Sequence, residues 1–402
     1  MPPMGRLGRL AGQALLVGLV VALIGSPSAQ AGTFRRDQSP QGQTDWPMFR
    51  FDPQRDGANP YETVLNKDNV GDLELAWSHE IGPGNTYGVL IPAPAVVGGV
   101  VYTATSGRLV AFDAATGDVV WRHHAHIVES SPAVVDGRLF IGQNDNYVHA
   151  YDAVTGTPLW KFRTGFIIRA SPAVENGVVY IRSTDDFAYA LNEATGALIW
   201  KREIALGSES SLAVADGRVY ASGGEGAVAL DAATGDVVWN SSCGGDPNHS
   251  QSAPAVVDGV VYVGFLNGLI CAFDGGTGDV LWVADRGFRA ILGSVAVYGG
   301  VVYSGSALGG LDAEVFALDA QTGAELWSVD QPYIFGQTSP AIANGVMYLP
   351  ARGTALAFDA ATGATLWTHA IVGKHDPSSP AVVNGRVYLD VESSRIYSFA
   401  LP

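Results

Sequence analysis

The chain has 402 residues, of which 47% are apolar and 15% charged, and its formal net charge at pH 7 is −16. This acidity argues against nucleic acid or anionic lipid as a partner, because both would be repelled. The 50 glycines, without a collagen period, are typical of an all-β protein with many tight turns.

The first 31 residues have the pattern of a secretory signal peptide. Arg6 and Arg9 precede an apolar run over 14–25, and residues 28–31 (Ser-Ala-Gln-Ala) form a small-x-small cleavage site. The run is about half of the roughly 20 residues that a membrane span needs. We therefore expect cleavage near Ala31 and a secreted protein, extracellular or periplasmic, without a transmembrane anchor. No cysteine follows the run to carry a lipid.

Residues 32–44 are interpreted as a linker, and a repeat with a period of about 40 residues occupies 45–402. The most regular member of the repeat is a tryptophan, found at Trp77, Trp121, Trp160, Trp200, Trp239, Trp282, Trp327 and Trp367. A fixed period with short, strand-rich units is the signature of a β-propeller, in which each repeat forms one blade.

Each repeat divides into strands at recognisable turns. A segment such as Ser131-Pro132-Ala133 begins the innermost strand, and Asn-Gly or Asp-Gly pairs such as Asp136-Gly137 predict two-residue hairpins, because both residues tolerate a positive φ. A Thr-Gly pair marks the last turn, and the Asp shortly before it can bond the backbone of its own turn.

Counting the strands fixes the number of blades. Eight units supply three strands each, and the last ends near 399–400 without the Thr-Gly-Trp segment. The missing strand is found at the other end of the chain, over 72–79. We therefore predict an all-β, eight-bladed propeller of four-stranded antiparallel blades, closed by this N-terminal strand joining the C-terminal blade.

The recurring tryptophans are interpreted as blade-docking residues, because an aromatic side chain at the end of each outer strand can bridge to the next blade. Cys243 and Cys271 flank one blade junction. Export to an oxidising compartment permits a disulfide between them, but spacing alone leaves the bonded and the free forms both open.

The repeat, with its Ala-x-Thr-Gly-x-x-x-Trp phrase, resembles the quinoprotein-type propellers of the pyrroloquinoline quinone (PQQ) family. Relatives of this family include the outer-membrane assembly propeller lipoproteins. The segment 45–50 (Asp-Trp-Pro-Met-Phe-Arg), with Asp52, Arg55 and Gly57, is similar to the segment that quinoprotein dehydrogenases place before their first blade. The resemblance covers nearly all of the chain after the leader.

The resemblance implies PQQ and calcium held by two adjacent cysteines, a Trp-Asp pair and an Asn-plus-acid set in long loops. Here no two cysteines are adjacent, those loops are short, and no Cys-x-x-Cys-His motif would attach a haem. We therefore expect no cofactor and no metal site, and PQQ with calcium belongs to the alternative function only.

The connections between each tryptophan and the next inner strand should converge around the central channel. The polar residues expected at this funnel mouth are Glu129, Arg169, Glu209, Gln251, Arg289 and Gln337. They could bind a polar ligand, a peptide or a metal-bridged group, or they could form a mutually neutralising plug.

Histidines cluster in the same connections, as His123, His124 and His126 show. A His-x-His pair could bind zinc or copper, but adjacent strand residues face opposite ways and no third ligand is near, so a solvated loop is favoured. The loops with Asp246 and His249, and with His369, His375 and Asp376, present the same choice. Turn residues Asp145, Asp185 and Asp186 are interpreted as structural.

The function predicted from the sequence is that of a secreted, monomeric binding scaffold for a protein or an extracellular ligand, without catalysis. The alternative is a PQQ- and calcium-dependent oxidoreductase of alcohols or sugars with a degenerate ligand set. A third class, hydrolase or lyase, has no supporting motif.

Overall fold

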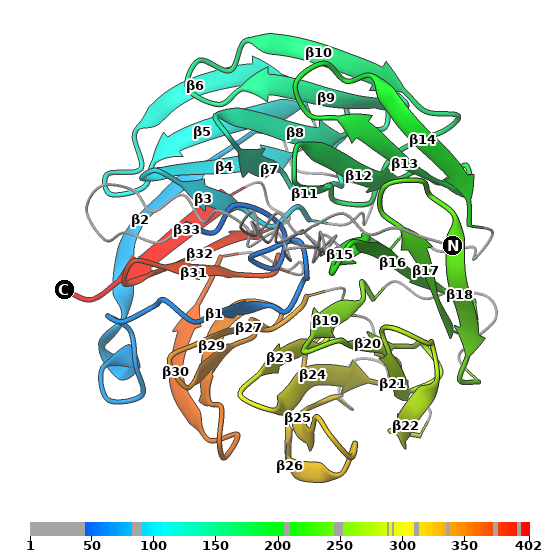
Figure 1. The fold of residues 1–402 in the computed structure, drawn as a ribbon. Coiled ribbons are helices and arrows are strands. Elements are labelled where there is room, and N and C mark those ends of the chain that lie inside the picture. The colour runs from blue at the N-terminus through cyan, green and yellow to red at the C-terminus, as the bar shows by residue number, and fades with distance from the viewer. Residues whose placement is uncertain are drawn as a thin grey trace, which may run out of the picture. The chain divides into compact units, whose positions relative to one another are not determined.

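A computed structural model of the chain shows eight antiparallel sheets that follow one another around a ring (Figure 1). The structure describes residues 45–82, 91–105, 107–204, 210–224, 226–244, 252–287, 289–291, 293–308, 313–334, 338–372, 377–391 and 395–402. The predicted all-β class and the eight blades are confirmed. Within these ranges only a 3-10 turn, η1 (Val70–Asp72), is helical, and no helix could cross a membrane.

In each blade four strands follow one another from the innermost, at the channel, to the outermost. Blade 1 comprises β3 (Ala95–Val97), β4 (Val100–Thr105), β5 (Arg108–Asp113) and β6 (Val119–His124), and blade 2 comprises β7 (Ala133–Val135), β8 (Arg138–Gly142), β9 (Tyr147–Asp152) and β10 (Pro158–Arg163). Blade 3 comprises β11 (Ala173–Glu175), β12 (Val178–Arg182), β13 (Phe187–Asn192) and β14 (Leu198–Glu203). Blade 4 comprises β15 (Ala213–Ala215), β16 (Arg218–Gly223), β17 (Gly226–Asp231) and β18 (Val237–Ser242).

The other half of the ring has the same plan. Blade 5 comprises β19 (Ala255–Val257), β20 (Val260–Gly264), β21 (Leu269–Asp274) and β22 (Val280–Asp285), and blade 6 comprises β23 (Ala296–Tyr298), β24 (Val301–Ala307), β25 (Ala313–Asp319) and β26 (Glu325–Asp330). Blade 7 comprises β27 (Ala341–Ala343), β28 (Val346–Tyr348), β29 (Thr354–Asp359) and β30 (Thr365–Ala370). Blade 8 comprises β31 (Ala381–Val383), β32 (Arg386–Val391), β33 (Arg395–Ala400) and β2 (Glu74–Glu80).

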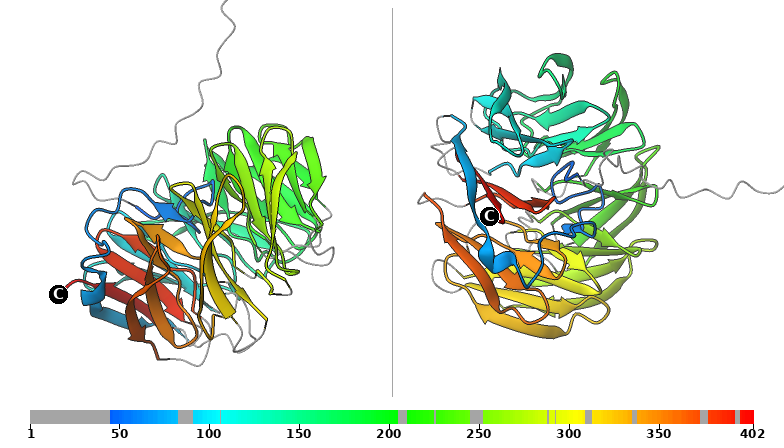
Figure 2. Two further views of the ribbon diagram at one scale, coloured as in Figure 1. Left: turned by 90° about the horizontal axis from the view of Figure 1, so that it is seen from below. Right: turned by 90° about the vertical axis from the view of Figure 1, so that its left-hand side faces the viewer.

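The ring closes as predicted, through the pairing of segments from opposite ends of the chain. The N-terminal strand β2 pairs antiparallel with β33, with Trp77 opposite Ser398. One feature differs from the prediction: blade 7 has a fifth strand, β1 (Ala58–Asn59), which pairs parallel with β27 on the channel side. Figure 2 shows the same ring from two further directions.

The hairpin turns have the backbone conformation that their sequences predict. Asp136 and Gly137 have φ values of 48° and 72°, and the Asn-Gly or Asp-Gly pair at the same hairpin of blades 3, 4, 5, 7 and 8 also has positive φ at both residues. In the last turn of blade 1, the Asp113 carboxylate accepts hydrogen bonds from the backbone N–H groups of Ala115 and Thr116, at 2.9 and 2.8 Å. These bonds lower the pKa of Asp113.

The tryptophans join neighbouring blades through a bond and a contact that repeat around the ring. Trp200 Nε1 donates to the Ala232 carbonyl of the next blade at 2.8 Å, and the other seven tryptophans make equivalent bonds of 2.8–3.1 Å. The glycine of the next Thr-Gly turn packs on the indole. A Cβ at Gly235 would lie 2.7 Å from the Trp200 ring. This position therefore requires glycine both because the indole leaves no space for a side chain and because the backbone φ is positive.

A belt of serine hydroxyls also links neighbouring blades at six of the eight junctions. The backbone N–H of Ser131 donates to the Ser171 hydroxyl of the next blade at 2.9 Å, and Ser171 N–H donates in turn to the Ser211 hydroxyl. The same bond joins blades 1 and 2 and blades 5 to 8. The serine of the Ser-Pro phrase is therefore a structural link.

The belt is interrupted at the two junctions where alanine replaces serine, and each has a different cross-link. Between blades 4 and 5, where Ala253 stands, a disulfide joins Cys243 to Cys271, with a Cα–Cα distance of 6.5 Å. Between blades 8 and 1, where Ala93 stands, the Thr103 hydroxyl donates to the buried Asp390 carboxylate.

Residues 46–59, here called the central segment, lie across the middle of the ring (Figure 1). They hydrogen-bond to the inner strand of every blade or to the residues just before it. The partners, from blade 1 to blade 8, are Val96, Val134, Ser171, Val214, Val256, Val297, Ile342 and Val382. The central segment thus reaches all eight blades, blades 3 and 8 through the side chains of Arg55 and Asn59 and the other six through its backbone.

Arg55 is the main side-chain link of the central segment, and it is fully buried. Its guanidinium donates to the carbonyls of Leu212, Ser171 and Pro172 at 2.8–2.9 Å, which spans blades 3 and 4. Burial lowers the pKa of Arg55 to about 9, but the carbonyl partners satisfy its donors.

Candidate binding face

The connections between blades and the turns between the second and third strands lie at the same end of the ring, because every blade is antiparallel. We call this end the loop face. A direct contact illustrates the arrangement: the N–H of Asn144, in the second turn of blade 2, donates to the Ile127 carbonyl in the connection from blade 1, at 3.0 Å.

Two of the residues predicted at the funnel mouth form an ion pair with each other. Arg169 Nε lies 2.6 Å from Glu129 Oε2, and the two residues come from consecutive connections. Asn144 Nδ2 donates to the other carboxylate oxygen at 2.9 Å. The Glu129 side chain is buried and that of Arg169 is one-third exposed. At this point charge is neutralised within the protein.

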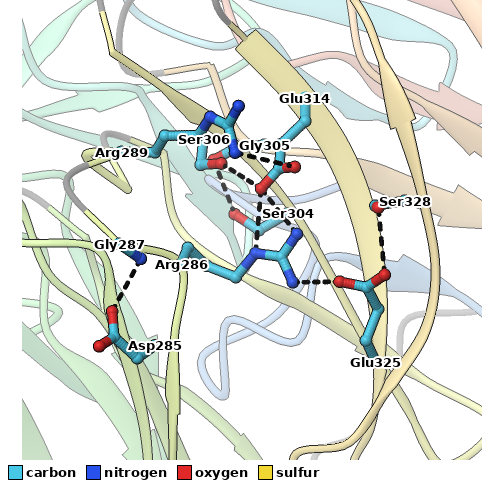
Figure 3. Close-up of polar contacts among 10 residues, drawn as sticks. All are labelled: Asp285, Arg286, Gly287, Arg289, Ser304, Gly305, Ser306, Glu314, Glu325 and Ser328. Atoms are coloured by element: carbon cyan, nitrogen blue, oxygen red, sulfur yellow. Dashed lines mark hydrogen bonds and ion pairs between the residues drawn. The ribbon is translucent and has the colours of Figure 1, made fainter.

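Arg289, predicted at the same mouth, lies on the far side of the ring in a cluster that joins blades 5 and 6 (Figure 3). Its Nη1 lies 3.6 Å from Glu314, which also binds Arg286 at 2.7 Å and the Ser306 hydroxyl at 2.9 Å. Arg286 pairs with Glu325 as well. The structure therefore does not bring Arg289 together with Glu129 and Arg169. Glu209, Gln251 and Gln337 lie outside the described residues.

Three of the described histidines near the loop face, His123, His126 and His149, lie against other side chains of the protein. His149 Nε2 is 2.9 Å and His126 Nε2 is 3.9 Å from the same Asp145 oxygen, and burial lowers the pKa of His149. The His123 ring packs on Tyr151, with centroids 4.8 Å apart. Of the residues that the structure describes, no three His, Cys, Asp or Glu side chains form a group that could hold a metal ion. Asp246, His249, His375 and Asp376 are not among them.

The described residues do not fit the cofactor set that the family resemblance implies. Arg169 and Arg289, which could bind the carboxylates of PQQ, already have carboxylate partners. The two cysteines are bonded, but they are 28 residues apart, and Cys271 is buried within β21. The disulfide therefore cross-links two blades and forms no ring of adjacent cysteines.

One recurring feature of the loop face was missed in the sequence: a large apolar residue six positions after the docking tryptophan. Ile127, Phe166 and Tyr333 occupy this position, with exposed fractions of 39%, 55% and 49%. The sequence also places Leu206 and Phe288 there, outside the described residues. The signal was available in the repeat, but exposure could be assigned only from the structure.

Hydrogen bonds fix the backbone that carries Phe166. Thr164 N–H donates to the Asn146 carbonyl at 2.9 Å, and the Thr164 hydroxyl donates to the Phe166 carbonyl at 2.7 Å. On the other side, Thr184 N–H donates to the Ile167 carbonyl at 3.0 Å. Phe166 is thus held between the turns of blades 2 and 3. A pre-ordered apolar side chain loses little entropy on binding.

Comparison with known proteins identifies the repeat. The family model described as outer membrane protein assembly factor BamB matches residues 65–166, 107–205, 144–306 and 267–401. The quinohemoprotein alcohol dehydrogenase of Comamonas testosteroni is 30% identical over 178 residues, which are 37% of this chain and 24% of that enzyme. The putative dehydrogenase XoxF of Paracoccus denitrificans is 29% identical over 38% of this chain and 27% of its own length.

Solved structures show the same fold at low identity. A quinohemoprotein alcohol dehydrogenase of Pseudomonas putida HK5 aligns with a TM-score of 0.73 at 17% identity, covering 89% of this chain and 80% of its own. BamB from Moraxella catarrhalis aligns with a TM-score of 0.68 at 19% identity, covering 82% and 99%. The chain therefore matches only about a quarter of the dehydrogenase sequences, whereas its fold is common to both groups.

Proposed function

Since the chain belongs to the PQQ-like repeat family described as outer membrane protein assembly factor BamB, we propose that it is an exported, non-catalytic scaffold that binds a partner protein through its loop face. The observation that carries this proposal is the recurring exposed apolar residue of the inter-blade connections, represented by Ile127, Phe166 and Tyr333. Exposed aromatic side chains on an ordered backbone are characteristic of the centres of protein interfaces.

The contacts within the ring support a binding role for the loop face. The central segment occupies the channel with hydrogen bonds to all eight blades. The charged pairs Glu129–Arg169 and Arg289–Glu314 are satisfied within the chain. On the loop face, the apolar side chains that project from the connections are therefore the candidates for contact with a partner.

Site-specific photo-crosslinking tests this proposal. A photoreactive residue in place of Phe166, in the protein produced in its own host, is expected to yield one discrete adduct. The matched control carries the same group at Leu281, which is 49% exposed directly before Trp282 on outer strand β22, away from the loop face. Equal labelling at both positions, or none at Phe166, would count against the loop face as the binding surface.

The alternative is a PQQ- and calcium-dependent dehydrogenase, and the matched dehydrogenase relatives favour it. It is tested by adding PQQ and Ca²⁺ to the purified protein and measuring dye-linked oxidation of alcohols and sugars. We expect no turnover above that of the same mixture without protein. Turnover together with a bound quinone spectrum would establish the alternative.

A further inference from the structure

The outer strands of blades 1 to 3 differ in charge from the rest of the ring. Directly after the docking tryptophan stand Arg122, Lys161 and Lys201, and Arg163 follows on β10. The other five outer strands, β2, β18, β22, β26 and β30, have no lysine or arginine. In Figure 1, β6, β10 and β14 are successive outer strands of the ring. We call the four cations the basic wall.

The four cations of the basic wall are all exposed. None of them forms an ion pair with another residue that the structure describes, whereas Arg202, a further cation on β14, pairs with Asp236 at 2.6 Å. Unpaired cations on three neighbouring strands are unexpected in a protein with a net charge of −16, because free carboxylates are abundant.

The two lysines of the basic wall are positioned by aromatic rings rather than by carboxylates. Lys161 Nζ lies 4.6 Å from the centroid of Tyr147, and Lys201 Nζ lies 3.7 Å from that of Phe187. Each ring comes from the third strand of the same blade, so the geometry repeats from blade 2 to blade 3. Stacking restrains the side chain while its charge stays available to a partner.

From this geometry we infer that the basic wall is a docking surface for a short acidic segment of a partner protein. Exposed aliphatic residues, such as Leu159 and Ile199, lie directly before the tryptophans of the same strands, so the segment would offer apolar as well as acidic side chains. The surface is separate from the loop face, and the inference does not depend on the function proposed for that face.

The size and surroundings of the basic wall favour a short segment over an extended polyanion. On one side of the wall, the neighbouring outer strand β2 carries Glu74 and Glu80 and no lysine or arginine; on the other side, β18 carries no charged residue, and β22 beyond it carries Asp285 and no lysine or arginine. A flat anionic membrane or a nucleic acid duplex would extend past the wall and meet this acidic surface, and repulsion acts over a screening length of about 8 Å in physiological salt. A segment that covers only three strands avoids the repulsion.

The test is fluorescence anisotropy with a fluorescein-labelled oligoglutamate peptide and the purified full chain. We expect binding that weakens with salt, and a loss of affinity of about tenfold in the variant that combines Lys161→Glu and Lys201→Glu. The matched control combines Lys67→Glu and Arg352→Glu, two exposed cations at blade 7, which changes the net charge equally away from the wall and should retain the affinity of the unmodified protein.

Each other outcome contradicts the inference. Equal loss in both double variants would mean that only net charge matters, and absence of peptide binding would remove the surface altogether. Binding to phosphatidylglycerol vesicles that depends on Lys161 and Lys201, without peptide binding, would replace the acidic segment by a membrane. Phe166→Ala should leave peptide binding unchanged, so a failure here is distinguishable from a failure of the loop-face proposal.

Discussion

The buried junctions and the loop face use the same repeat in opposite ways. At the junctions, each repeat residue meets the same partner in blade after blade, as Trp200 meets Ala232 and Ser131 meets Ser171. On the loop face, one repeat position holds different apolar residues that project from the protein, as Ile127 and Phe166 do. The repeat positions with the same residue in most blades therefore hold the blades together. The exposed position whose residue varies between blades is the candidate for binding.

The largest loss of stability should follow from removing the buried Arg55 cation of the central segment. Arg55→Met leaves the carbonyls of Leu212, Ser171 and Pro172 without their buried donor. Each unsatisfied group costs about 1–3 kcal/mol, so we expect a loss of at least about 4 kcal/mol in the free energy of unfolding. Urea denaturation measures it. A loss below about 1 kcal/mol would show that the central segment is dispensable.

Removal of one docking tryptophan should cause the next largest loss in the free energy of unfolding. Trp200→Ala takes away a buried indole and its bond to Ala232, and we expect a loss of roughly 3–5 kcal/mol in urea denaturation. Leu159→Ala, at an exposed position of a neighbouring outer strand, should change the same free energy by less than about 0.5 kcal/mol. Similar losses in the two variants would contradict the distinction between junction and surface.

The junction between blades 8 and 1 should depend on pH through Asp390. Burial raises the pKa of this carboxyl from 3.8 to about 8. Between these values the folded protein keeps a proton that the unfolded chain releases, so the stabilising contribution is complete below about pH 4 and is lost as the pH rises through about 8.

Asp390→Asn should remove this dependence. Thermal unfolding at pH 5 and pH 8 should show that the unmodified protein loses about 4 kcal/mol more than the variant over this interval. Parallel losses would indicate that Asp390 titrates normally, and that another group causes any pH dependence of stability.

The smallest effect concerns the serine belt. Ser171→Ala removes one hydroxyl acceptor between blades 2 and 3, and we expect a loss of about 1 kcal/mol by urea denaturation. Ala253→Ser places a hydroxyl where the belt is interrupted and should stabilise the protein by a few tenths of a kcal/mol up to about 1. Stabilisation by both changes would exclude the belt as a structural link.

The sequence was sufficient for the blades because their signals are local and repeated. The turn at Asp136-Gly137 and the unpaired strand ending at Trp77 each follow from a few adjacent residues, and eight copies agree. The course of the central segment could not be predicted, because the partners of Arg55 are up to 157 residues away in the chain. The pairing of Arg289 with Glu314 was missed for the same reason.

The candidate binding positions show a different limit. Glu129 and Arg169 come from consecutive connections and form an ion pair, and only the structure shows this neutralisation. The repeat position of Phe166 can be identified in the sequence, but its exposure cannot. An apolar residue in a connection can equally be buried, as Ile168 is. Burial depends on the neighbouring turns, and no local pattern encodes it.

The most direct test of the binding role compares partner recovery by two matched double variants of the full chain. Ile127→Ala with Phe166→Ala alters the loop face, and Val238→Ala with Leu281→Ala alters similarly exposed positions on outer strands β18 and β22, outside both the loop face and the basic wall. At equal amounts of folded protein, we expect the first variant to lose the partner crosslinked at the loop face and the second to retain it. Equal recovery by both would contradict the assignment of the loop face as the binding surface.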